Sequence, residues 1–212
     1  MTLPRRAALA AALALAAAPA LAQPSPAIVR QAPATRIAPQ IVRGVVKVAK
    51  VDALVLKTRE GKEVTVNLAP TWTVSVMKPI TVAAIQPGSF IGTAEMPQKD
   101  GRGKSLEVHI FPPGVKMGEG HYAWDLKKGS MMTNGTVGKV VASKNGQELD
   151  VTYSYGTRHI VVPKNVPIVQ ITPGERAMIK PGVSVFLVAQ PSAKGLTTNA
   201  ISTGEKGKAP PM

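Results

Sequence analysis

Ile85-Gln86-Pro87-Gly88 in the first half of the chain is matched by Ile179-Lys180-Pro181-Gly182 in the second half, 94 residues further on. Gly44 and Gly135 form a second matched pair, with an offset of 91 residues. Changes in turn length account for a drift of a few residues between such offsets. The sequence therefore predicts a duplicated domain.

Short runs of β-branched residues lie on both sides of these landmarks, with turn residues such as Asn145-Gly146 between them. In the first half we expect strands at 42–50, 53–58, 62–68, 88–96 and 105–111. The first three strands expected in the second half are 135–143, 149–155 and 158–162, and they match the first three of the first half. Residues 72–85 are less regular, and 81–85 suits a helical turn. Five strands with an irregular segment after the third are typical of a small Greek-key barrel of the OB type.

The predicted fold is all-β, with two tandem OB-like barrels at 42–113 and 134–204, joined by an ordered connector at 114–133. A six-stranded barrel or a loose sandwich is the alternative for each half. Residues 23–41, with four prolines, are expected to form a disordered Pro-rich linker, and 205–212 a disordered tail.

The N-terminus has the pattern of a secretory signal peptide at 1–22. Arg5 and Arg6 precede an Ala/Leu run at 7–18, and Ala20-Leu21-Ala22 is a small-residue cleavage pattern. The apolar run is shorter than the roughly 20 residues that span a membrane. The sequence predicts Sec-type export to the periplasm or beyond, cleavage after Ala22 and no transmembrane segment afterwards. The paired arginines leave twin-arginine export open as an alternative.

The composition is basic and contains no cysteine. The formal charge is +14, and loss of Arg5 and Arg6 with the signal lowers it to +12. This balance favours anionic partners, although it also serves solubility. Without cysteine, the chain has no disulfides, thiolate metal sites or cysteine nucleophile.

Several motifs together resemble a family. They are Arg43-Gly44, Ile85 to Gly92, Glu107 to Phe111, Gly118-Glu119-Gly120-His121 with Trp124-Asp125-Leu126, and Met132-Thr133-Asn134. The pattern resembles secreted bacterial proteins with an OB-like domain of unknown function, some of which are automatically labelled metal-transporter permeases. The resemblance covers essentially the whole chain after the signal. It implies a fold and a location, and no activity.

The connector supplies the first group of candidate binding residues: His121, Tyr122, Trp124 and Asp125. A flexible linker would lack such large aromatic side chains. We therefore expect the connector to hold the two barrels together. On this hypothesis, truncating Trp124 would split one melting transition into two.

A metal site in the connector is a second hypothesis. His109, Met117 and His121, with Met131 and Met132 close by, offer imidazole and thioether ligands that suit copper or zinc. The alternative is that the methionines fill the irregular gap between the barrels. The prediction is of no cofactor, with copper or zinc as the open possibility.

The second half offers a basic and aromatic cluster on its second and third strands: Tyr153, Tyr155, Arg158 and His159. OB barrels bind ligands across these strands. The same place in the first half holds Lys57, Thr58, Arg59 and Lys62, without an aromatic side chain. Nucleic acid is disfavoured, since aromatic residues make up only 4% of the chain and an exported protein meets little of it.

No arrangement of residues typical of an active site is recognisable, such as a Gly-x-Ser-x-Gly elbow or a His-Glu-x-x-His run. The leading interpretation is a non-catalytic periplasmic binding or scaffold protein whose partner is an envelope protein or an anionic polymer. A metal-handling accessory protein and an enzyme of unknown type are the alternatives. The oligomeric state is not predicted.

Overall fold

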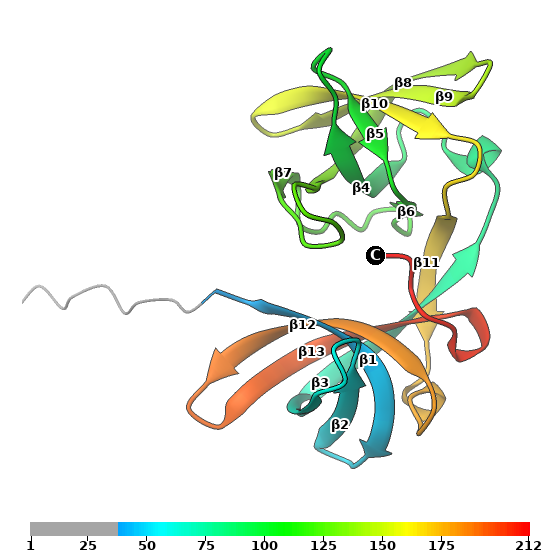
Figure 1. The fold of residues 1–212 in the computed structure, drawn as a ribbon. Coiled ribbons are helices and arrows are strands. Elements are labelled where there is room, and N and C mark those ends of the chain that lie inside the picture. The colour runs from blue at the N-terminus through cyan, green and yellow to red at the C-terminus, as the bar shows by residue number, and fades with distance from the viewer. Residues whose placement is uncertain (1–37) are drawn as a thin grey trace, which may run out of the picture. The chain divides into compact units, whose positions relative to one another are not determined.

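The computed structural model describes residues 38–212 (Figure 1), so the predicted signal peptide and most of the Pro-rich linker lie outside the described residues. Residues 38–212 form thirteen strands and three short 3₁₀ helices. The strands are β1 (Gln40–Ala49), β2 (Ala53–Thr58), β3 (Glu63–Pro79), β4 (Phe90–Pro97), β5 (Gly103–Ser105), β6 (Val108–Ile110), β7 (Gly120–Ala123), β8 (Met131–Ser143), β9 (Gly146–Tyr153), β10 (Gly156–Pro163), β11 (Ile168–Gly174), β12 (Ser184–Ser192) and β13 (Gly195–Gly204). The 3₁₀ helices are η1 (Val82–Ala84), η2 (Arg176–Met178) and η3 (Glu205–Gly207). The all-β prediction is confirmed.

The strands close into two five-membered rings. Barrel 1 has the strand order β1-β2-β3-β13-β12, and β12 returns to β1. Barrel 2 has the order β8-β9-β10-β5-β4, and β4 returns to β8. Each ring contains one parallel pair, β3 with β13 and β10 with β5, and its other pairs are antiparallel. Closure leaves few free strand edges.

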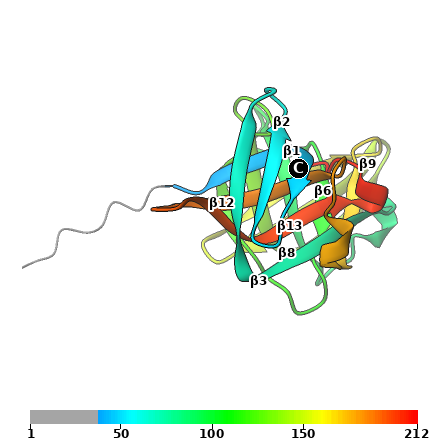
Figure 2. The same ribbon diagram turned by 90° about the horizontal axis from the view of Figure 1, so that it is seen from below.

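Each barrel takes three strands from one half of the chain and two from the other. Figures 1 and 2 show blue and cyan β1–β3 beside orange and red β12 and β13. This pairing differs from the expected division into barrels at 42–113 and 134–204. A barrel built from 42–113 would need β4 beside β1, but β4 pairs with β8 and β12 pairs with β1.

The long strand β3 carries the chain from one barrel to the other. The expected irregular segment at 72–85 is instead strand as far as Pro79. Val74–Pro79 pairs antiparallel with β11, which carries the chain back. Trp72, Val74 and Val76 are buried and alternate with polar residues, the period of a strand.

Hydrogen bonds at the landmark motifs confirm that the halves are exchanged symmetrically. The Gly88 N–H donates to the Val137 carbonyl (2.7 Å), and the Gly182 N–H donates to the Val46 carbonyl (2.9 Å). Both glycines have positive φ, 86° and 90°, a conformation that glycine adopts without strain. The Pro-Gly turn of each half thus docks on the first strand of the other half.

The barrels have separate apolar cores. Barrel 1 packs a cluster that includes Val46, Leu56 and Ile201, and barrel 2 packs one that includes Ile91, Leu149 and Ile160. Ile85 joins the core of barrel 2, as part of the exchange.

The C-terminal residues are ordered, so the expected disordered tail at 205–212 is wrong. Glu205–Gly207 is a 3₁₀ helix, and Met212 is 6% exposed. Met212 packs with Met77, Val169 and Phe186 in a third apolar cluster. Among residues 38–212, no helix is long and apolar enough to span a membrane.

Candidate functional site

The predicted connector includes strand β7, which lies along β8. Gly120 stands opposite Asn134, and Ala123 stands opposite Met131. The Tyr155 hydroxyl accepts a hydrogen bond from the His121 N–H (2.8 Å) and donates one to the His121 carbonyl (3.1 Å). The His121 and Tyr153 rings stack with centroids 6.2 Å apart. The structure thus brings together predicted residues from the connector and from the β9–β10 hairpin.

Arg158 joins this cluster through a buried carboxylate. Its Nε donates to Oε1 of Glu95 (2.8 Å), and Glu95 is fully buried. Burial raises the pKa of Glu95, while Arg158 opposes the rise. The His121 Nδ1 lies 3.7 Å from Glu95 Oε1 and hydrogen-bonds Thr133 Oγ1 (2.8 Å).

The ionic state of the cluster follows from these contacts. Burial, followed by the charge of Arg158, lowers the pKa of His121. The neutral imidazole is therefore favoured near pH 7, and the Arg158 charge faces the Glu95 carboxyl. Arg158 also donates to the carbonyls of Gly101 (2.6 Å) and Arg102 (3.3 Å). It is committed to internal contacts.

His159 has a separate environment on β10. Its Nδ1 lies 2.7 Å from Asp150 Oδ1, and its Nε2 lies 3.0 Å from Glu148 Oε2. These two carboxylates raise the pKa of His159. An incoming anion would compete with both of them, so the cationic members of the predicted cluster are already partnered.

Trp124 and Asp125 contact barrel 1. The Arg43 guanidinium makes two hydrogen bonds to the Asp125 carboxylate, of 2.8 and 2.7 Å, and holds the pKa of Asp125 below its usual range. Arg43 also lies 5.8 Å from the centroid of the Trp124 ring, which packs beside Phe186. This end of the connector joins the two barrels.

The proposed metal ligands are placed differently from one another. The His109 side chain is buried with Nδ1 3.0 Å from Glu107 Oε2, whereas Met117 is 57% exposed. Across residues 38–212, no group of three or more histidine, aspartate or glutamate side chains could hold a metal ion.

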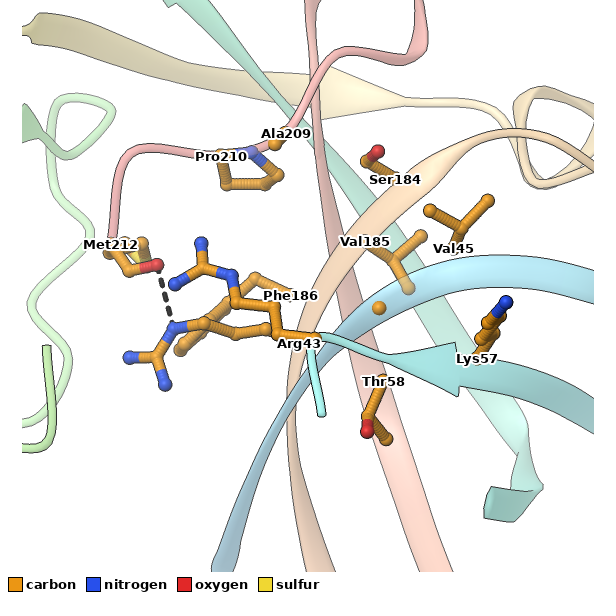
Figure 3. A pocket seen from close by; sticks show the side chains of 12 residues that line it. Arg43, Val45, Lys57, Thr58, Ser184, Val185, Phe186, Ala209, Pro210 and Met212 are labelled. Atoms are coloured by element: carbon orange, nitrogen blue, oxygen red, sulfur yellow. Dashed lines mark hydrogen bonds between the residues drawn. The ribbon is translucent and has the colours of Figure 1, made fainter. Parts of the chain in front are cut away.

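Barrel 1 contains a basic pocket, and only some of the residues that line it were identified from the sequence. Its cavity volume is about 130 Å³. Figure 3 shows Arg43, Lys57, Ser184, Phe186 and Met212 around it. The residues that line it are Arg43, Gly44, Val45, Lys57, Thr58, Arg59, Ser184, Val185, Phe186, Ala209, Pro210 and Met212.

Three cationic side chains line this basic pocket, and no aspartate or glutamate side chain does. Lys57 and Arg59 are exposed, and neither forms a salt bridge with any residue in the described part of the chain. Arg43 donates Nε to the Met212 carbonyl oxygen (2.8 Å), the bond drawn in Figure 3. Lys57 and Arg59 could be found in the sequence as a basic pair, but the contribution of Arg43 depends on the tertiary fold.

A second hollow of about 400 Å³ lies beside the start of the connector. Phe90, Phe111, Pro112 and Pro113 line it, with Lys116 as its one cation. The Lys116 Nζ lies 5.9 Å from the centroid of the Phe90 ring. This hollow offers apolar contact and little charge.

Comparison of the chain with protein-family models, with curated proteins and with solved structures finds no match.

Proposed function

We propose that this chain is a binding or scaffold protein, without catalysis of its own, that recognises an anionic partner through the basic pocket of barrel 1. The observation that carries the proposal is the charge of the lining, with Arg43, Lys57 and Arg59 around one hollow and no aspartate or glutamate side chain among the lining residues. The charge of Arg43 is shared with Asp125, so Lys57 and Arg59 supply the attraction.

The position of the pocket supports this assignment. We infer that both barrels are of the OB type, because each is a closed ring of five strands with one parallel pair. Barrels of this type bind ligands over the face of the second and third strands. Lys57 and Thr58 end the second strand of barrel 1, and Arg59 follows in the turn.

The predicted signal peptide places this recognition in the periplasm or outside the cell. The partners available there include acidic regions of envelope proteins and anionic polymers or lipids. A formal charge of +12 after signal removal favours encounter with any of them.

The test measures binding of the mature chain to polyglutamate and to phosphatidylglycerol vesicles at low and at physiological salt. We expect at least one probe to bind, with an affinity that falls as salt rises. The double variant Lys57→Glu/Arg59→Glu should lose at least tenfold in affinity. The matched control Lys139→Glu/Lys144→Glu makes the same charge change on exposed lysines of barrel 2 and should lose much less. Equal losses in the two variants, or no binding by the wild type, would overturn the proposal.

A further inference from the structure

The exchanged repeat places the first strands β1 and β8 in equivalent positions. Arg43 pairs with Phe186 and Gln40 with Ala189 across β1 and β12. Asn134 pairs with Gly92 and Met131 with Glu95 across β8 and β4. Equivalent residues of β1 and β8 are 91 residues apart in the sequence, and their partners on β4 and β12 are 94 residues apart. Both offsets are the same at the two ends of the paired segment. Gln40–Arg43 in barrel 1 therefore corresponds to 131–134 in barrel 2.

The two equivalent segments differ at their other edge. In barrel 2, β7 covers the edge of residues 131–134 with four antiparallel pairs, from Gly120–Asn134 to Ala123–Met131. In barrel 1, β2 begins to pair with β1 only at Gly44. Within residues 38–212, the only strand that pairs with Gln40–Arg43 is β12. We call the side of residues 40–43 that faces away from β12 the open edge.

The basic pocket lies at the end of the open edge. In barrel 2 the first residue of β7, Gly120, stands opposite Asn134, and the Tyr155 side chain covers it. In barrel 1 the position of Asn134 is held by Arg43, and Lys57 at the end of β2 and Arg59 in the turn that follows lie nearby. The place that barrel 2 fills with its own connector and tyrosines is a cationic hollow in barrel 1.

We propose that the open edge binds an extended acidic segment of a partner protein, added antiparallel to β1 as β7 is added to β8. This inference rests on the proposed function and specifies its partner. Backbone hydrogen bonds to the edge of the sheet supply affinity in this mode of recognition, and side-chain pockets supply specificity. Acidic side chains near the start of the bound segment face Lys57 and Arg59.

The charges of the chain argue against two other occupants of the open edge, its own N-terminal residues and a second copy of the chain. Asp52 is the first acidic residue in the sequence, so residues 1–39 carry no carboxylate side chain. A second copy that offered its own β1 edge would bring Arg43, Lys57 and Arg59 against the same three cations. A partner with carboxylates has neither disadvantage.

The experiment uses the mature chain and three eight-residue probes. The first alternates glutamate and valine. The second has the same sequence with N-methyl groups on alternate residues, which block one edge of the peptide. The third replaces each glutamate with glutamine. Binding is measured by titration calorimetry, and the bound site is located by amide hydrogen exchange at residues 40–43.

We expect the first probe to bind and to slow exchange of those β1 amides that point away from β12. The N-methylated and glutamine probes should each bind at least tenfold more weakly, and Lys57→Glu/Arg59→Glu should abolish the preference for glutamate. Protection at 131–134 serves as the control, since β7 covers that edge already and it should not change.

The outcomes separate this inference from the proposed function. Equal binding of the N-methylated and unmodified acidic probes, lost in Lys57→Glu/Arg59→Glu, would keep the anion site and overturn strand addition. No binding of any probe, together with no binding of polyglutamate or vesicles, would overturn both. Protection of the open edge in the free chain would show that another occupant holds it. A concentration-dependent dimer with that edge protected would identify a second copy as the occupant. Either result overturns the proposal.

Discussion

Barrel 1 and barrel 2 share a backbone plan and differ in the chemistry of their walls. Thr93 and Glu95 on β4 of barrel 2 correspond to Leu187 and Ala189 on β12 of barrel 1. Barrel 2 therefore buries the carboxylate of Glu95, which Arg158 partners, whereas barrel 1 has apolar side chains at the equivalent positions. Arg158 of barrel 2 is thus held in internal contacts, whereas Lys57 and Arg59 of barrel 1 are exposed at the surface.

Replacing Glu95 by alanine, the residue that barrel 1 has at this level, tests the buried pair. Arg158 would lose its charged partner, and removal of one member of a buried ion pair costs about 3–5 kcal/mol of unfolding free energy. Urea unfolding measures the loss. Asp100→Ala breaks the exposed pair with Arg102 and serves as the control, with a small effect expected. A Glu95→Ala variant as stable as the Asp100→Ala variant would contradict the account.

Trp124→Ala tests how the barrels are joined. We expect a loss of about 3 kcal/mol, the low end for tryptophan truncation, because the side chain is only partly buried. The strand exchange ties the halves together through β3 and β11, so one cooperative transition should remain. This expectation revises the split transition predicted from the sequence. Calorimetry decides between them, and two resolved transitions would favour independent halves.

Gly44→Ala and Gly135→Ala test the equivalence of the first strands. A Cβ on Gly44 would lie 2.5 Å from the Lys57 carbonyl oxygen, and one on Gly135 would lie 2.4 Å from that of Thr152. Overpacking of this kind costs about 1–3 kcal/mol, and we expect similar losses at both sites. Gly138→Ala is the control, since its Cβ would meet the Asp150 carbonyl oxygen at an ordinary 3.7 Å. Unequal losses at Gly44 and Gly135, or a comparable loss at Gly138, would weaken the equivalence.

The smallest expected effect is a pH dependence of the folding stability, caused by His159 in barrel 2. Asp150 and Glu148 raise the folded-state pKa of His159 above 6.5. Protonation therefore stabilises the fold; this contribution is complete below about pH 6.5 and is lost as pH rises through the folded-state value. NMR titration of the imidazole measures the pKa. The stability advantage over His159→Gln should shrink as pH rises, and a pKa at or below 6.5 would contradict the contacts.

The sequence predicted the β class, the repeat and most turn positions, because alternation and Gly or Pro at turns act locally. It did not predict which strands share a barrel. The same local sequence patterns suit a half that closes into its own barrel and a half that exchanges strands with the other. Which of the two forms depends on whether residues 72–79 continue the third strand and carry the chain away. The alternation of Trp72, Val74 and Val76 was the available signal that this segment continues as strand.

The candidate site was predictable in part for a similar reason. His121, Tyr153, Tyr155 and Arg158 were identified and do come together, with Arg158 joined through Glu95. Glu95 lies on β4, and nothing in the sequence indicates that its side chain reaches past β5 to Arg158 on β10. The open edge of β1 could be recognised only by comparing the two barrels after the strand pairing was known.

The equivalences all depend on the strand exchange, which engineered disulfides test most directly because the chain has no cysteine of its own. Val45 stands opposite Ser184 in the exchanged fold, and directly opposed cross-strand Cβ atoms lie about 4.5–5.5 Å apart. In two self-contained barrels, Val45 would stand opposite Phe90 instead. We predict that the monomeric variant Val45→Cys/Ser184→Cys oxidises readily to an intramolecular disulfide, and that Val45→Cys/Phe90→Cys does not. The reverse result would contradict the strand exchange.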